Sequence, residues 1–296
     1  MKVVTTLLAA AAAAILPGLS SAAVFPPTID LCADTSRHVI VARGTAQVYQ
    51  GHPTTALLAD GRTMFCVWTI GHGGSCGPLK RSDDGERTWS ELLPTPANWT
   101  TAFNCPALYR LADPHGGERL FVFAGHGPDG DMQSAHSTDN GRTWTPMTGL
   151  GLRCVMPFCT IAPVEGGRRL LGMTNMRRPG ERRDKKSNVI VQSLSIDGGA
   201  TWAPWRVVLD LGRLKPCEPA LVRSPDGCRL LCLLRENTER VSLGIASDDE
   251  GRTWSEPRPL PPGLHGDRHV ARYAPDGRLV VCFRDTGKAS PTRNHF

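Results

Sequence analysis

Three residues with reactive or charged side chains occupy the same place in three related segments of the chain: His52, Glu218 and Arg268. Each lies nine residues before the glycine of an Asp-Gly turn, where a purely structural strand would carry Val or Ile. Imidazole titrates near neutral pH and suits acid–base chemistry, and the planar guanidinium group suits a carboxylate ligand. Since a buried polar group needs a partner or a ligand, we expect the three side chains to meet in a functional site.

Each of these residues begins a segment that reads as a β-hairpin, in which an Asp-Gly turn joins two apolar strands. The segments are His52–Trp68, Glu218–Arg235 and Arg268–Arg284, and looser copies span Cys105–Phe123 and Pro157–Asn175. Equivalent strand ends in a repeated structure gather around a common axis, which is why we expect the first residues to converge.

An eight-residue phrase recurs four times between these hairpins. Its copies are Ser82–Trp89, Ser137–Trp144, Ser195–Trp202 and Ser247–Trp254, and their tryptophans lie 55, 58 and 52 residues apart. A period of this length indicates repeated blades or solenoid turns. Ser and Asp side chains can close the turn, Gly supplies a positive φ, and Thr-Trp re-enters a strand where the indole fills the core. Only the first copy departs, with Glu86 in place of a glycine.

The phrase resembles the Asp-box of sialidases, a family of six-bladed β-propellers, and the resemblance covers about Tyr49 to Phe296. It implies an all-β fold in which each blade holds an inner hairpin followed by an Asp-box hairpin. Counted in this way, the chain holds about four and a half blades and is incomplete at its C-terminus, because no outer hairpin follows Arg284. In the family the box lies away from the binding face, so we expect its aspartates to be structural: Asp84, Asp139, Asp197 and Asp249.

The same resemblance implies roles for site residues. Sialidases clamp the substrate carboxylate with three arginines, and they use a tyrosine nucleophile, its glutamate base and an aspartate acid/base. Glu218 and Arg235 look like the base and one clamp arginine, and Arg268 or Arg284 would supply another. Counted from the turn glycine, Arg235 is eight residues on and Arg284 seven, which without a bulge predicts opposite faces of the sheet. We therefore favour Arg268, which shares the register of Glu218.

The chain departs from the family pattern at three places. Tyr49–Pro53 stands where the family has an Arg-Ile-Pro phrase, which makes His52 the candidate substrate-binding residue there. The Gly-rich loop Gly71–Gly77 replaces the loop with the acid/base aspartate. His72 in this loop could act as acid or base, or be incidental to it. The family's tyrosine belongs to a blade beyond Phe296, and none of the three tyrosines present matches by motif.

The first residues, Met1–Ala23, have the short basic start, apolar run and small-residue cleavage site of a secretory signal. We expect residues 24–296 to form one propeller domain, secreted or periplasmic, and no later stretch is long enough for a membrane span. The net charge of +6 is mostly local, since residues 177–186 hold six basic and two acidic side chains. We interpret that stretch as a solvated loop, not as a patch for nucleic acid.

Ten cysteines would permit disulfides in an exported chain. Three of them follow a turn glycine by five residues: Cys66, Cys232 and Cys282. We expect these three to be equivalent, buried small hydrophobes. A bridge between Cys154 and Cys159, or from Cys228 to a neighbour, is left open.

The leading interpretation is an exo-sialidase-like glycoside hydrolase that acts on terminal sialic acid or related acidic sugars. Arginines would hold the carboxylate, Glu218 would be the base, and no cofactor is implied. His265–His269 and His126 lack the carboxylate or thiolate set of a metal site. The alternative is a non-catalytic glycan-binding propeller or an inactive fragment of a sialidase-like enzyme. A third reading is action on an unrelated substrate through His52 and His72.

Overall fold

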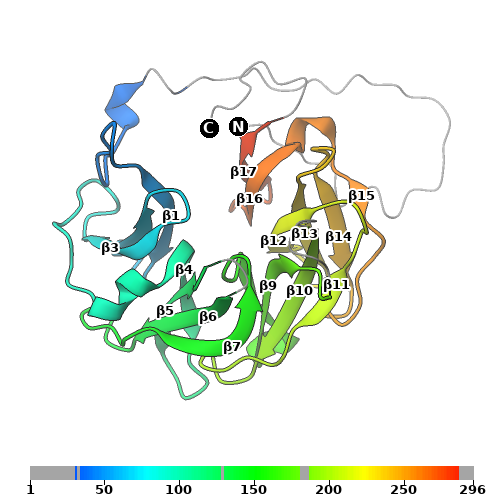
Figure 1. Ribbon diagram of the computed structural model, residues 1–296, viewed down its shortest axis with the longest axis horizontal. Coiled ribbons are helices and arrows are strands. Elements are labelled where there is room, and N and C mark those ends of the chain that lie inside the picture. The colour runs from blue at the N-terminus through cyan, green and yellow to red at the C-terminus, as the bar shows by residue number, and fades with distance from the viewer. Residues whose placement is uncertain (1–30, 32–33, 128–129, 181–186, 287–296) are drawn as a thin grey trace. The chain divides into compact units, whose positions relative to one another are not determined.

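The computed structural model describes residues 31, 34–127, 130–180 and 187–286 (Figure 1). These residues form antiparallel strands and four short 3-10 helices, with no α-helix among them. The all-β class predicted from the sequence is confirmed. Two compact units can be distinguished, one over Ser36–Arg213 and one from Leu214 onward. The predicted signal sequence lies outside the described residues. No helix of the described part is long and apolar enough to cross a membrane.

The unit Ser36–Arg213 contains two antiparallel sheets whose strands follow one another in chain order. The larger sheet, blue to green in Figure 1, consists of β1 (Gln50–Leu57), β2 (Met64–Ile70), β3 (Ser75–Ser82), β4 (Phe103–Ala112), β5 (Glu118–Gly125), β6 (Gly130–Ser137) and β7 (Thr148–Cys154). The smaller sheet consists of β8 (Thr160–Val164), β9 (Arg169–Arg177), β10 (Asn188–Ser195) and β11 (Arg206–Leu209). The short helices of this region are η1 (Thr35–Arg37), η2 (Ala97–Thr101) and η3 (Glu165–Gly167).

The unit from Leu214 onward also contains two antiparallel sheets. The four-stranded sheet consists of β12 (Pro216–Arg223), β13 (Leu230–Glu236), β14 (Leu243–Ser247) and β15 (Arg258–Pro259). The two-stranded sheet consists of β16 (Gly266–Tyr273) and β17 (Leu279–Asp285), and η4 (Pro262–Leu264) precedes it. Leu233, Leu264 and Val281 are among the buried side chains that join the two sheets in one core.

The hairpins predicted from the sequence are confirmed as β1–β2, β4–β5, β8–β9, β12–β13 and β16–β17. An Asp-box follows the third strand of each repeat, after β3, β6, β10 and β14. A fourth strand follows the later three boxes, as β7, β11 and β15. The predicted order of a plain hairpin and then an Asp-box is therefore confirmed in the four repeats that contain a box, and in the later three the box joins two paired strands.

Each Asp-box closes on itself through one set of hydrogen bonds. In the second copy the hydroxyl of Ser137 donates to Asp139 (2.7 Å) and accepts from the N–H of Gly141 (2.8 Å). The Asp139 carboxylate accepts from the backbone N–H and the hydroxyl of Thr143, at 2.9 and 2.6 Å. The other three copies repeat these contacts. The aspartates are thus committed to holding the turn.

The single departure, Glu86, is accommodated by its surroundings. Gly141, its counterpart in the second box, has a φ of 79°, and a β-carbon there would lie 2.2 Å from the ring of Phe65. Glu86 adopts nearly the same left-handed conformation, with a φ of 71°, but its side chain is exposed. The first box is therefore destabilised only by the backbone strain of a non-glycine residue at positive φ, and not by a steric clash of the side chain.

The box aspartates predict acid sensitivity. The pKa values of Asp84 and Asp249 are lowered from 3.8 to about 2, first by the hydroxyl of the threonine four residues on and then by its backbone N–H. A carboxyl whose pKa is lowered by folding stabilises the protein fully above pH 3.8, and this stabilisation is lost as the pH falls through 2. We expect the melting temperature to fall between pH 4 and 2, and Asp249→Asn to weaken this dependence. An unchanged pH dependence in Asp249→Asn would contradict this role of the box aspartates.

Candidate active site

The first strand of four hairpins is interrupted by a β-bulge, seen as a shift in strand register. Each bulge contains a non-glycine residue in the left-handed region: His52 (φ 51°), Cys105 (φ 51°), Glu218 (φ 51°) and Arg268 (φ 54°). Bulges re-aim a side chain, and such strained residues cluster at functional sites. The three residues selected by their spacing therefore share one backbone conformation. Cys105, the first residue of a looser copy, shares it too, although the sequence analysis did not select it as a site residue.

Glu218 lies at the centre of a cluster in the unit from Leu214 onward. Its carboxylate oxygens accept hydrogen bonds from one terminal nitrogen of Arg235, at 3.1 and 3.2 Å. Its Oε2 also accepts from the backbone N–H of Arg268 (3.1 Å), and Nε of Arg268 lies 3.5 Å from its Oε1. The structure thus brings together the glutamate and the two arginines that the sequence analysis favoured.

A second carboxylate, that of Asp267, completes the cluster. Its Oδ1 lies 2.8 Å from Nε of Arg235, an ion pair whose N–H is not aligned for a hydrogen bond. Its Oδ2 accepts from Nε of Arg284 (3.0 Å) and also from Nη2 of the same guanidinium group. Arg235 therefore bridges the two carboxylates, and Arg284 belongs to the same group of charges.

The position of Arg284 corrects the sequence analysis. Arg235 pairs with Cys217, and Arg284 pairs with Asp267. Both partners immediately precede the bulge residue, so the two arginines occupy equivalent positions and face the same side. The prediction of opposite faces is wrong because the turn 274–278 is one residue shorter than the turn 224–229. Counting from the turn glycine therefore shifts the register by one residue.

The carboxylates lie deeper than the arginines. The side chains of Glu218 and Asp267 are 9% and 10% exposed, against 23% for Arg235, 41% for Arg268 and 39% for Arg284. Burial alone would lower the pKa of Arg235, but the carboxylates of Glu218 and Asp267 help to raise it above its ordinary value. Arg235 therefore stays charged, and guanidinium groups form the accessible part of the cluster.

His269 supports the cluster from the core. Its ring is 3% exposed, stacks on Phe283 at a centroid distance of 5.3 Å, and lies with Nε2 2.8 Å from the carbonyl oxygen of Leu264. Burial lowers its pKa, so it is neutral at pH 7. Within the described residues no three His, Cys, Asp or Glu side chains are grouped as metal ligands.

His52 and His72 also come together, in the unit Ser36–Arg213. Their ring centroids lie 4.6 Å apart, and Nδ1 of His52 accepts from the backbone N–H of Gly73 (3.3 Å). A β-carbon at Gly74 would lie 1.9 Å from the carbonyl oxygen of Ile70, so the loop requires a glycine there. His52 thus holds the loop that presents the exposed ring of His72.

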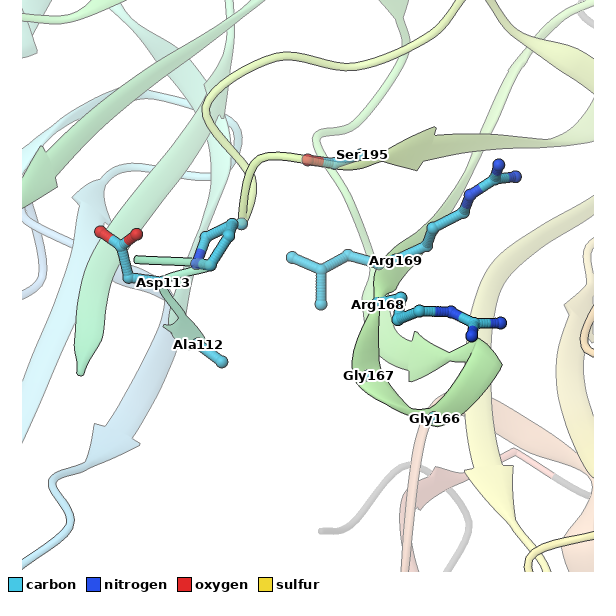
Figure 2. Close-up of a pocket in the computed structure, with 10 residues that line it drawn as sticks. Ala112, Asp113, Gly166, Gly167, Arg168, Arg169 and Ser195 are labelled. Carbon is cyan, nitrogen blue, oxygen red and sulfur yellow. The ribbon is translucent and has the colours of Figure 1, made fainter. Parts of the chain in front are cut away.

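A cavity of about 410 Å³ lies elsewhere in the same unit, among the turns at the Asp-box ends of the strands. Figure 2 shows Asp113 on one wall, while the guanidinium groups of Arg168 and Arg169 point away from it. The Asp113 carboxylate is paired with Nε of Arg119 at 3.0 Å. The cavity therefore lacks a set of groups able to do chemistry, and the arginine cluster is the stronger candidate.

No disulfide joins any two of the nine described cysteines, so neither bridge left open by the sequence analysis is formed among them. Cys282 also departs from expectation. It pairs with Val270 next to the bulge, one register position away from Cys232, and it is exposed. The shorter turn explains this shift too.

Thiol labelling tests this assignment. We expect Cys228 and Cys282, which are exposed, to react with a thiol reagent in the native protein. Cys66 and Cys76 should react only after denaturation, because burial raises their pKa values to about 11 and 12. Mass spectrometry of the labelled protein identifies the sites, with Cys282→Ser as control. Native labelling of Cys66 would contradict the assigned register.

A family model described as BNR repeat-like domain matches residues 79–293, which is 215 of the 296 residues. A search of curated protein sequences found no significant match. The structure, in contrast, resembles many solved structures.

A protein of unknown function from Dyadobacter fermentans aligns with a TM-score of 0.61 and 16% identity, over 83% of this chain and 78% of that protein. A leech intramolecular trans-sialidase complexed with 2,7-anhydro-Neu5Ac gives 0.60 and 14%, over 86% and 58%. An intramolecular trans-sialidase from Ruminococcus gnavus in complex with oseltamivir carboxylate gives 0.58 and 15%, over 84% and 80%. At these identities the likeness shows a shared fold, and the chain spans little more than half of the leech enzyme.

Proposed function

We propose, from the premise that this chain belongs to the family of BNR repeat-like domains, that it is an exo-sialidase-like glycoside hydrolase. Its substrate would be terminal sialic acid or a related acidic sugar of a glycan. We further propose that residues 24–296 belong to a sialidase-like β-propeller, six-bladed in the family, and that Met1–Ala23 directs its export. The sialidase-like fold of the solved relatives supports this proposal.

The observation that carries the proposal is the grouping of Arg235, Arg268 and Arg284 around two buried carboxylates. Guanidinium groups offer planar, charge-assisted hydrogen bonds that match a substrate carboxylate. Arg268 and Arg284 are the more exposed of the three, so an acidic sugar that approaches from solvent meets them first. Three positive side chains against two negative ones favour an anionic ligand.

Glu218 would act as the base in this site. It is buried, and its orientation is fixed by hydrogen bonds from Arg235 and from the backbone of Arg268. Its Oε1 lies 3.1 Å from Nη1 of Arg235 and 3.5 Å from Nε of Arg268, the arginines that would hold the sugar. A positioned carboxylate of this kind can take a proton from a nucleophile. In the unit Ser36–Arg213, acid–base action of His72 and substrate binding by His52 remain predictions, and there His52 contacts the loop that carries His72.

A specific observation favours the alternative, a non-catalytic glycan-binding protein. Both oxygens of Glu218 already accept hydrogen bonds from Arg235 or Arg268. The family uses a tyrosine nucleophile, but the hydroxyl of Tyr109, one of the three tyrosines of this chain, already donates to the carbonyl oxygen of Phe158 (2.9 Å). The cluster would then hold an acidic sugar without cleaving it.

The test is to incubate the purified chain with a synthetic sialoside that releases a fluorescent phenol, and to measure sialic acid binding by calorimetry. Release that is abolished by Arg235→Ala would support the hydrolase. Binding without release would support the alternative. If the chain neither binds nor cleaves, both proposals are wrong.

A further inference from the structure

Glu236, the last residue of β13, directly follows Arg235 and is 3% exposed. Its carboxylate accepts four backbone N–H bonds. Those to Oε1 come from Lys215 (2.9 Å) and Thr238 (2.7 Å), and those to Oε2 come from Glu239 (2.6 Å) and Arg240 (3.2 Å). One side chain thus accepts hydrogen bonds from most of the backbone N–H groups of the loop that leaves β13.

The charge of Glu236 is maintained by these bonds. Burial raises the pKa of Glu236, but the hydrogen bonds from the backbone of Lys215, Glu239 and Thr238 outweigh it, so that the pKa lies below its ordinary value. The group is therefore ionised at neutral pH. Backbone N–H groups of a loop without strand partners need acceptors, and a carboxylate makes stronger bonds than a neutral acceptor.

The loop Asn237–Arg240 lies at the end of the sheet that carries the arginine cluster. Asn237 donates its backbone N–H to Lys215 (3.2 Å) and its side-chain amide to the sulfur of Cys217 (3.3 Å). Cys217 pairs with Arg235 and immediately precedes Glu218. All four loop residues are nevertheless exposed. A fixed, exposed and polar loop therefore stands beside the cluster.

We propose that Asn237–Arg240 is a specificity loop that contacts the neutral sugar next to the acidic sugar, and that Glu236 is the positioning residue that holds it. This inference rests on the proposed function, because the cluster must first hold an acidic sugar. The loop begins two residues beyond Arg235, and its amide, hydroxyl and charged side chains are of the kinds that hydrogen-bond sugar hydroxyls. Since its backbone is held by Glu236, these groups would meet the sugar without first being ordered.

The anchoring role can be tested without any sugar. In Glu236→Ala we expect amide hydrogen exchange of Thr238, Glu239 and Arg240 to accelerate about tenfold or more, because each loses a bond to a charged acceptor. Trypsin cleavage after Arg240 should accelerate in parallel. In Glu236→Gln, which keeps the size of the side chain, the exchange rates should lie between those of the wild type and those of Glu236→Ala. If Glu236→Ala does not fold, Glu236→Gln alone is compared with the wild type. Glu239→Ala, in the same loop, is the matched control. Unchanged exchange in both Glu236 variants would overturn the anchoring role.

The specificity role is tested by comparing N-acetylneuraminic acid with 3'-sialyllactose as ligands. We expect Glu236→Gln to bind the monosaccharide as the wild type does and to lose about tenfold in affinity for the trisaccharide. An equal loss for both ligands, or no loss for either, would overturn it. If the wild type binds neither sugar, the proposed function and the specificity role both fall, while the exchange measurement still decides whether Glu236 anchors the loop.

Discussion

Replacing Glu218 by glutamine is expected to abolish hydrolysis of an acidic glycoside while leaving glycan binding largely intact. The amide keeps the shape of the carboxylate and an oxygen that can accept from Arg235 or from the backbone of Arg268. It cannot take a proton, and a general base contributes roughly 10²- to 10⁴-fold to rate. The fall should therefore appear in kcat, measured with the fluorogenic sialoside, and hardly in the binding constant from calorimetry.

Glu250→Gln is the matched control for this experiment. Glu250 also forms a close ion pair with an arginine of the same unit, at 2.7 Å from Arg223, but it lies in an Asp-box and not in the arginine cluster. Its loss should leave kcat unchanged. An unchanged rate in Glu218→Gln would remove Glu218 from the mechanism. A joint loss of binding, rate and melting temperature would mean that the cluster is structural, since breaking a buried ion pair commonly costs about 3–5 kcal/mol.

The repeats explain why so much of the fold was predictable. Asp-Gly turns between apolar runs mark hairpins locally, and the box residues Ser137, Asp139 and Thr143 satisfy one another within a single turn. Neither signal depends on distant contacts. Glu218 was expected beside Arg268 for a related reason, because equivalent strand ends of repeated hairpins were expected to gather at one place, and the two residues are in contact.

The rest of the cluster depends on register, which the sequence pattern does not reveal. The turn 274–278 lacks one residue relative to its counterpart, and this alone moves Arg284 to the face opposite to the one predicted. The sequence analysis did not select Asp267, because it lies one residue before the repeated position. Its carboxylate nevertheless forms ion pairs with both Arg235 and Arg284. Cys105 was not selected as a site residue because its strand continues for seven residues beyond it, against five after Glu218. Its signal was the following proline, which also follows His52 and Glu218.

Trp202→Ala is expected to destabilise the protein by about 3–5 kcal/mol, the usual cost of truncating a buried aromatic side chain. Trp202 is the most buried of the four box tryptophans, with its ring centroid 4.2 Å from that of Phe158 and 6.1 Å from that of Phe123. Its indole N–H donates to the carbonyl oxygen of Gly199 (3.0 Å), so the substitution also leaves an acceptor of the box unsatisfied.

The repeat supplies its own control for this prediction. Trp89 ends the first Asp-box at the same position but is only half-buried, so Trp89→Ala should cost clearly less, as measured by urea unfolding of both variants. Equal costs would mean that the tryptophan acts through the box turn and not through core packing. The folded fraction of Trp202→Ala should keep the glycan binding of the wild type, because its contacts with Phe158, Phe123 and Gly199 involve no residue of the arginine cluster. A variant that melts like the wild type but no longer binds would instead make the Asp-box part of the functional site.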